Sequence, residues 1–199
     1  MQTFLSVAVL AGIVTLAYGA GVFESKMVEV KSVVVDCDQE ILYTASESAK
    51  DCYNKCTEDG NCRMASYNIR DKQCGLVPPQ FDCTFGTEVF NDYEVIGSTN
   101  KPFIQRDNAS LDAGELKNQK GQRVLQGANG KKARISADKC KSLCDFHPNC
   151  KAAYYTAARG QAGTCQLMAK AEPIRQIIEP TSTSIVLVAQ FWGGLPAPT

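Results

Sequence analysis

Cysteine provides the most reactive side chains of this 199-residue sequence. A thiol can attack a substrate, bind a metal or form a disulfide, and each role needs different neighbours. A zinc site would need more cysteine or histidine ligands than disulfide bonding leaves over. The even number of cysteines predicts five disulfides and no free thiol, provided that the chain follows an oxidising route. The ten positions are Cys37, Cys52, Cys56, Cys62, Cys74, Cys83, Cys140, Cys144, Cys150 and Cys165.

The N-terminal segment predicts that oxidising route. Residues 1–20 contain an apolar run from Phe4 to Leu16 without a charged side chain, followed by Ala-Tyr-Gly-Ala. The run is shorter than the roughly 20 apolar residues of a membrane span, so we expect a cleaved signal peptide and a secreted, extracellular protein. No later segment is long and apolar enough to predict a membrane span.

The other side chains that support catalysis are sparse. His147 is the only histidine, so dyads with a second histidine and His-rich metal sites are unavailable. It lies in a turn-forming cluster and is predicted to be a surface turn residue. The acidic pairs Glu58-Asp59 and Asp36/Asp38 lack the loop spacing of a calcium site. We therefore expect a protein that is not an enzyme and that uses no cofactor or metal.

Charge is divided unevenly between the halves of a chain whose net charge is zero. Residues 21–100 hold 7 Lys/Arg and 14 Asp/Glu, a net charge of −7, and residues 101–199 hold the reverse, a net charge of +7. Such a division bears on partners rather than on the fold. A basic stretch of the second half is interrupted only by Asp138: Lys117, Lys120, Arg123, Lys131, Lys132, Arg134, Lys139 and Lys141.

That basic stretch supports two interpretations. One is an ordinary solvated face. The other is a binding site for a sulfated glycan or another polyanion, with ligand contacts from Lys131, Lys132, Arg134, Lys139 and Lys141. Nucleic acid is not an expected partner, because the secreted chain is neutral overall and does not interleave aromatic with basic residues.

A single N-glycosylation sequon, Asn108-Ala109-Ser110, lies in a polar stretch of the second half. Because the chain is predicted to be secreted and the sequon contains no proline, we expect a glycan on Asn108. The alternative is an exposed polar turn without a glycan.

The cysteines belong to an internal repeat. An offset of 88 residues superimposes the pattern Cys-x3-Cys-x5-Cys on itself, placing Cys52, Cys56 and Cys62 on Cys140, Cys144 and Cys150. In the same alignment, three extra residues around 160–163 bring Cys74 onto Cys165. A match at a fixed offset, interrupted by one loop-like insertion, indicates a duplication.

Each repeat predicts one helix and several short strands. Ser48 and Ser136 are good helix N-caps, and the turn-forming clusters 58–61 and 146–149 end the helices. Cysteines four residues apart lie on one helical face, so both sulfurs can point at the same sheet. The predicted strands of the first repeat are Arg63–Ile69 and one opening at Cys74, flanked by Val28–Val35 and Tyr93–Ile96. Those of the second repeat are Lys151–Thr156 and one opening at Cys165, with Val124–Leu125 and Ile185–Val188 in the places of the flanking strands.

The predicted fold class is therefore α+β. It consists of two small disulfide-stapled modules, each with one helix packed on a mainly antiparallel sheet. The expected boundaries are a signal peptide at 1–20, a first module at 21–98, a second module at 101–192 and a short tail at 193–199. The junction is predicted near 97–100.

These patterns resemble the PAN/apple domain family over nearly the whole mature chain. Its modules carry Cys-x3-Cys on a helix, a third cysteine that opens a strand with an aromatic residue, and a Cys-x-Leu strand. The matching segments are Cys52–Cys56, Cys62–Tyr67 and Cys74–Leu76, and Cys140–Cys144, Cys150–Tyr155 and Cys165–Leu167.

Both copies depart from the family pattern at one position. Ala65 and Ala153 stand where the family commonly has a large aromatic residue, and we expect Tyr67, Tyr154 or Tyr155 to fill the volume.

The resemblance also implies a disulfide pairing, whereas the sequence alone permits other connectivities. In the family the first cysteine pairs with the sixth, the second with the fifth and the third with the fourth, and the second copy here lacks the outer pair. The implied bonds are Cys37–Cys83, Cys52–Cys74, Cys56–Cys62, Cys140–Cys165 and Cys144–Cys150.

The resemblance further implies a non-catalytic adhesion or recognition protein of the extracellular space. The family includes heparin-binding and protein-binding members, so the expected partner is an extracellular protein or a sulfated glycan. The charge division motivates an alternative from a different class: a structural matrix component that self-associates through its acidic and basic halves.

Overall fold

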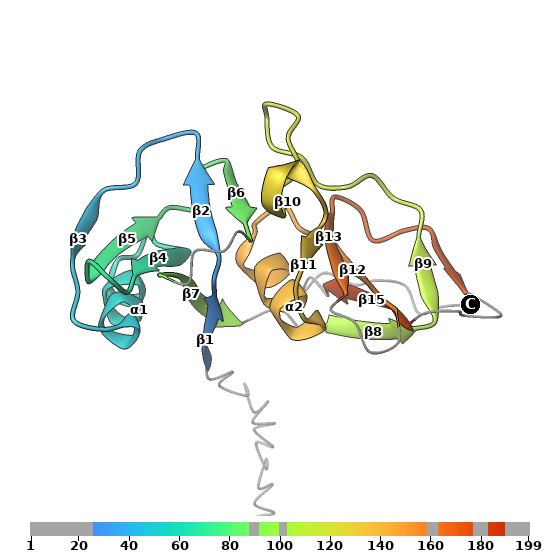
Figure 1. Cartoon of the computed structure of the whole chain (residues 1–199), viewed down its shortest axis with the longest axis horizontal. Coiled ribbons are helices and arrows are strands. Elements are labelled where there is room, and N and C mark those ends of the chain that lie inside the picture. Colours follow the sequence, from blue (N-terminus) through green and yellow to red (C-terminus); the bar gives the residue numbers. More distant parts are fainter. Residues whose placement is uncertain (1–25, 88–91, 100–102, 159–162, 177–182, 190–199) are drawn as a thin grey trace, which may run out of the picture.

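The computed structural model describes residues 26–87, 92–99, 103–158, 163–176 and 183–189. The predicted signal peptide and the predicted tail lie outside these ranges. Two modules of similar architecture follow one another along the chain (Figure 1), which confirms the α+β fold class. In the part of the chain that is described, no helix is long and apolar enough to cross a membrane.

The first module is a five-stranded antiparallel sheet with a helix on one face. The strand order is β1-β7-β4-β5-β3. Every residue of β4 is buried, which shows that both faces of this sheet are covered. The elements are β1 (Lys26–Lys31), β3 (Tyr43–Ala45), α1 (Ala49–Glu58), β4 (Met64–Asn68), β5 (Gln73–Val77) and β7 (Tyr93–Thr99).

The second module repeats this sheet in the order β8-β15-β12-β13-β11, and α2 packs on one face. The edge strand equivalent to β1 is β8, so the prediction that Val124–Leu125 takes this place is wrong. The predicted junction near 97–100 overlaps the end of β7 at Thr99, and β8 begins at Phe103. The elements are β8 (Phe103–Asp107), β11 (Ala133–Arg134), α2 (Ala137–Phe146), β12 (Ala152–Ala157), β13 (Thr164–Met168) and β15 (Thr183–Ala189).

A left-handed residue breaks the first predicted strand in two. Ser32 has a φ of 61° and separates β1 from β2 (Val34–Cys37), and Asn108, with a φ of 51°, separates β8 from β9 (Ala109–Leu111). Each turn directs the chain out of the main sheet and into a small ladder. There β2 pairs with β6 (Cys83–Gly86), and β9 pairs with β14 (Ile174–Gln176).

The segment 112–132, which connects β9 to β11, reaches back to the first module. Its strand β10 (Leu125–Gln126) pairs in parallel with β6, so the small sheet β10-β6-β2 combines both modules. The Phe85 amide donates a hydrogen bond to the Val124 carbonyl at 2.6 Å, and the Thr87 amide donates one to Gln126 at 2.8 Å. The segment is therefore a strap across the junction.

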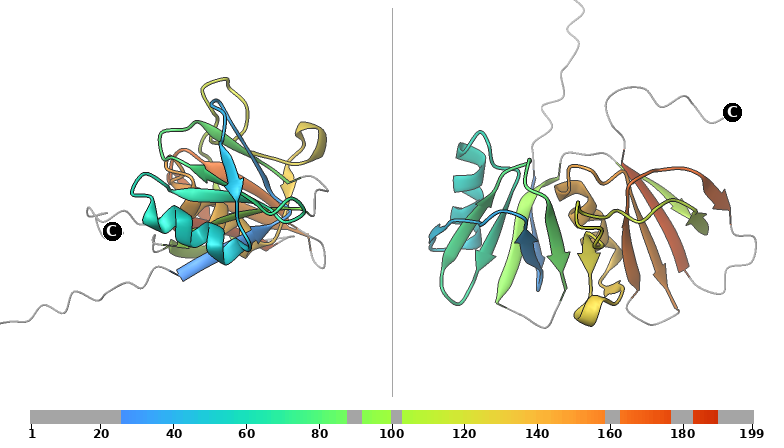
Figure 2. Two further views of the ribbon diagram at one scale, coloured as in Figure 1. Left: turned by 90° about the vertical axis from the view of Figure 1, so that its left-hand side faces the viewer. Right: turned by 90° about the horizontal axis from the view of Figure 1, so that it is seen from above.

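Helix α2 lies between the sheets of the two modules, as the right-hand view of Figure 2 shows. Leu143 and Phe146 are fully buried and share one apolar core with Val30 and Val95 of the first module. The ring of Phe146 lies over Gly97, where a Cβ atom would come within 2.6 Å of the ring. The corresponding positions of α1 carry exposed or half-exposed charged side chains, Lys55 and Glu58.

Side chains and backbone of the first module hold both ends of α2. The Arg63 guanidinium donates to the Asp145 carbonyl at 2.9 Å and to the Phe146 carbonyl. The last carbonyls of a helix lack partners within it, so Arg63 satisfies acceptors that would otherwise be buried unpaired. Burial lowers the pKa of Arg63, and the charge of Asp145 opposes that change. At the other end, Lys139 Nζ donates to the Lys31 carbonyl at 3.2 Å.

His147 is buried, which corrects its prediction as a surface turn residue. Only 3% of its surface is exposed. Its ring lies edge-on to Phe85 of β6, with 6.1 Å between the ring centroids, and its Nδ1 accepts a hydrogen bond from the Asn149 amide at 3.2 Å. The composition of a turn predicts its backbone shape but not whether another module covers it.

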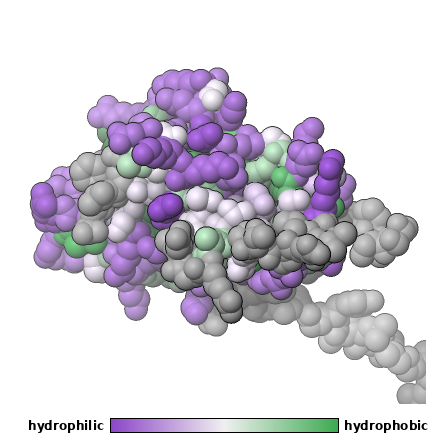
Figure 3. Space-filling model, turned by 45° about the vertical axis from the view of Figure 1, so that its right-hand side comes forward, coloured by the Kyte–Doolittle hydropathy of each residue, from purple (hydrophilic) through white to green (hydrophobic). Residues whose placement is uncertain are grey.

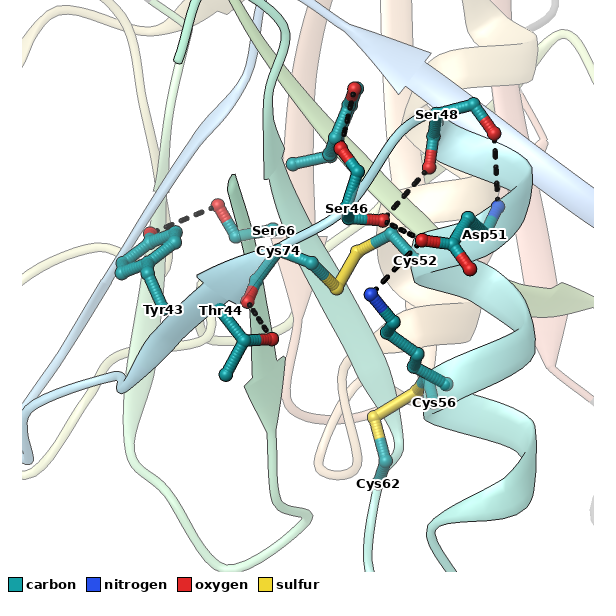
Figure 4. Close-up of a disulfide and its surroundings, with 12 residues drawn as sticks. Tyr43, Thr44, Ser46, Ser48, Asp51, Cys52, Cys56, Cys62, Ser66 and Cys74 are labelled. Carbon is teal, nitrogen blue, oxygen red and sulfur yellow. Dashed lines mark hydrogen bonds and ion pairs between the residues drawn. A yellow bond between two sulfur atoms is a disulfide. The ribbon is translucent and has the colours of Figure 1, made fainter. Parts of the chain in front are cut away.

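Disulfides tie each helix to its own module. In the first module, Cys52 of α1 is bonded to Cys74 of β5, and Cys56 is bonded to Cys62 (Figure 4). No cysteine is free, and the chain's ten cysteines all lie in described segments. The remaining bonds, Cys140–Cys165, Cys144–Cys150 and Cys37–Cys83, complete the pairing that the family resemblance implies.

The small residues Ala65 and Ala153 are fully buried on the helix-facing side of their sheets. Strand side chains alternate between faces, so Tyr67 and Tyr155, two residues further on, share that side. Both tyrosines are buried and hydrogen-bonded: Tyr67 Oη donates to the Ser46 carbonyl, and Tyr155 Oη accepts from the Gly163 amide. These two tyrosines supply the expected volume, whereas Tyr154 packs on the opposite face.

Serine caps begin both helices, as predicted. The Ser48 side chain accepts from the Asp51 amide at 3.1 Å, and Ser136 accepts from the Lys139 amide at 3.3 Å. At α1 the Asp51 carboxylate also accepts from Ser46 Oγ at 2.8 Å (Figure 4). The same carboxylate pairs with Lys55 at 3.0 Å. The hydrogen bonds from Lys55 and Ser46 lower the pKa of Asp51 below its ordinary value of 3.8.

The packing of α2 predicts unequal effects of matched substitutions in the two helices. Phe146→Ala should lower the free energy of unfolding by about 3–5 kcal/mol, because it leaves a cavity between the modules. Glu58→Ala, at the corresponding exposed position of α1, should change it by less than about 0.5 kcal/mol. Denaturant unfolding of the oxidised chain measures both, and equal effects would contradict the shared packing of α2.

The cap network of α1 predicts a pH effect. Because folding lowers the pKa of Asp51, its stabilisation is present above about pH 4 and is lost as the pH falls through the folded-state pKa. Asp51→Asn should therefore flatten the fall in stability between about pH 6 and about pH 3. The parent chain, measured at the same two pH values, gives the reference slope. An unchanged slope in Asp51→Asn would rule out this role.

Candidate functional site

Three of the predicted ligand-binding cations line a single groove at the module junction. Its volume is about 560 Å³, within the range of about 300–1,000 Å³ that is typical of ligand sites. None of its described lining residues is acidic. The lining residues are Thr87, Gly127, Ala128, Lys131, Lys132, Arg134 and Thr164.

The edge strand β11 aims two of these cations outward. Ala133 is fully buried in the core, so its neighbours Lys132 and Arg134 point to the exposed side of the strand. Arg134 lies opposite Thr164 in the ladder with β13, which places Thr164 at the groove. Lys132 Nζ also donates to Gln166 Oε1 at 3.3 Å.

A tight turn fixes the third cation. The short helix η1 (Ala128–Gly130) precedes Lys131, and the Lys131 amide donates to the Ala128 carbonyl at 3.2 Å. The Lys131 carbonyl in turn accepts from the Gly127 amide at 2.8 Å. The backbone of Lys131 is therefore held at both polar groups, while its side chain remains exposed.

The first module supplies part of the wall. Thr87 follows β6, and its amide and its hydroxyl both donate to the Gln126 carbonyl, at 2.8 and 3.2 Å. The groove is therefore complete only when the strap and the first module are paired. Hydrophilic side chains gather at the top of the molecule (Figure 3), the end at which the strap lies in Figure 1.

The structure separates the other two predicted ligand residues from this groove. Lys139 is directed to the Lys31 carbonyl of the first module. Lys141 lies over the ring of Phe103, with 5.4 Å from its Nζ to the ring centroid. The spacing of basic residues along the sequence does not show that α2 turns these two side chains toward other partners.

The two threonines of the groove could not be predicted from the sequence. Thr87 belongs to the other module, and Thr164 is placed by strand pairing. A signal for the strap is nevertheless present in the repeat. The first copy passes from β2 to β3 over residues 38–42, whereas the second uses 112–132 between β9 and β11. An insertion confined to one copy of a repeat often forms part of a binding face.

The described residues offer no site for metal chemistry. Among them, no group of three or more His, Cys, Asp or Glu side chains could hold a metal ion. Every cysteine is bonded to another, so none is available as a nucleophile or a ligand. The lysine and arginine side chains that line the groove supply positive charge and hydrogen-bond donors.

Asn108 lies at an exposed turn between β8 and β9. Such a position gives the side chain access to solvent, as a glycan acceptor needs. Secretion from animal cells should yield a chain that loses mass on enzymatic removal of N-glycans, measured by intact-protein mass spectrometry. Asn108→Gln should secrete without that mass difference, and a parent chain of unmodified mass would contradict the glycan prediction.

A comparison with family models supports the repeat. The PAN domain model matches residues 27–97 and 118–191, one segment in each module and together more than half of the chain. No curated protein matches the sequence. PAN domains are generally protein- or carbohydrate-binding modules, and disulfide-rich PAN domains are typical of extracellular proteins. The chain belongs to the PAN domain family and carries two of its domains in tandem.

Proposed function

We propose that this protein is a non-catalytic, extracellular recognition protein that binds a sulfated glycan in the basic groove at its module junction. The observation that carries the proposal is the convergence of Lys131, Lys132 and Arg134 on one groove whose described lining residues include no acid. PAN domains as a family bind protein or carbohydrate, which supports a binding role.

Binding follows from charge and hydrogen-bond geometry. The planar Arg134 guanidinium can donate two parallel hydrogen bonds to a sulfate, and the lysine ammonium groups supply compact positive charge. Each ion pair with a polyanion releases condensed counterions, so affinity falls as salt rises. Thr87 and Thr164 form part of the wall, where the Thr87 hydroxyl is already bonded to the Gln126 carbonyl and that of Thr164 to Thr156.

The fixed position of the groove favours selectivity for a patterned ligand. Lys131 is held by its turn, β11 is held by β13, and Thr87 is held by the strap. A site that is ordered before binding loses less conformational entropy when the ligand arrives. A surface that binds polyanions by charge alone has no such fixed geometry, and comparing heparin with a sulfonate cation exchanger distinguishes the two cases.

Retention on heparin tests the proposal. The oxidised mature chain should elute from heparin at a clearly higher salt concentration than from a sulfonate cation exchanger. The variant Lys131→Glu/Lys132→Glu/Arg134→Glu should lose that difference and bind heparin at least tenfold more weakly, because each lost charge-assisted hydrogen bond contributes about 1.5–3 kcal/mol.

A control of equal charge change separates the groove from overall charge. Lys26→Glu/Lys50→Glu/Lys170→Glu alters three exposed lysines away from the groove. It should retain the preference for heparin over the sulfonate matrix. Equal, weak retention of the parent on both matrices would contradict glycan binding and would redirect the search to protein partners.

A further inference from the structure

A second hollow adjoins the basic groove on the other side of η1. Its volume is about 260 Å³, and it lies over the mixed sheet β10-β6-β2. Gly127 lines both hollows, whereas Ala128 lines only the groove and Asn129 lines only the second hollow. The three-residue turn η1 is thus the ridge between two neighbouring sites.

The chemistry of the second hollow differs from that of the groove. No lysine or arginine is among its described lining residues, which include Asp36, Thr84, Gln122, Gln126 and Asn129. Side-chain amides and hydroxyls can both donate and accept, which suits the hydroxyl and acetamido groups of sugars. A carboxylate accepts from hydroxyls and repels sulfates.

The frame around this hollow is well braced. Arg123 forms an ion pair with Glu115 at 2.8 Å, and its guanidinium donates to the Gly130 carbonyl at 3.3 Å. Gln126 Nε2 donates to the Arg123 carbonyl at 2.9 Å, and Thr84 Oγ1 donates to the Asp36 carbonyl at 3.4 Å. These contacts hold the turn and the strands that carry Asp36 and Asn129.

We propose that the second hollow is a subsite for an unsulfated sugar unit of the same glycan chain. The protein then reads a linear glycan in which a sulfated block meets an unsulfated one, with the sulfated block in the groove. The proposal rests on the proposed function of the groove. Because η1 is short, consecutive units of one oligosaccharide can occupy both hollows.

Size-matched oligosaccharides test this reading. Calorimetry should show that the parent binds a heparan sulfate oligosaccharide with one sulfated and one unsulfated block at least fivefold more tightly than a fully sulfated heparin oligosaccharide of equal length. The variant Asp36→Asn/Asn129→Gly should lose this preference. Glycine suits position 129, because Asn129 has a φ of 57°.

Heparin retention of the same variant serves as the folding control. Its elution from heparin should match or exceed the parent's, because the groove is intact and one negative charge is gone. A parent without preference, or a variant that keeps the parent's preference, would overturn the subsite and leave the groove standing. Failure of the parent to bind either oligosaccharide would overturn the proposed function and the subsite together.

Discussion

The burial of α2 between two sheets is the interaction on which the rest of the structure depends. A sheet has two faces, and α1 covers only one face of the first module's sheet. The other face presents Val30, Met64 and Val95, which would be exposed to water without α2. Gly97 permits the close approach of Phe146, and Arg63 satisfies the carbonyls at the end of the helix. One apolar core therefore extends through both modules.

This packing gives the proposed binding groove its geometry. The strap 112–132 pairs with β6, and α2 packs between the two modules beside it. Thr87 and Lys131 then lie on one groove although they belong to different modules. Helix α1, by contrast, has a polar outer face with Lys55, which is half-exposed, and Glu58, which is exposed to solvent. The two PAN domains thus form one packed unit rather than two separate ones.

The local features of the fold could be predicted from the sequence, whereas the contacts between modules could not. Cysteine spacing and serine caps predict the helices because these signals act within one repeat. Val124–Leu125 is apolar and extended, but its sequence does not reveal that it pairs with β6. A comparison of the helices contains the missed signal. Leu143 and Phe146 stand where α1 has Lys55 and Glu58, so α2 has a second apolar face.

Amide hydrogen exchange of the intact, oxidised chain tests most directly whether the two modules are one unit. If α2 belongs to both sheets, the slowest amides of β4 and β7 and those of α2, β12 and β13 should exchange through the same opening, with the same free energy. Amides of β4 and β7 that open at a clearly lower free energy, while α2 and β12 stay protected, would show two independent modules and contradict the shared core.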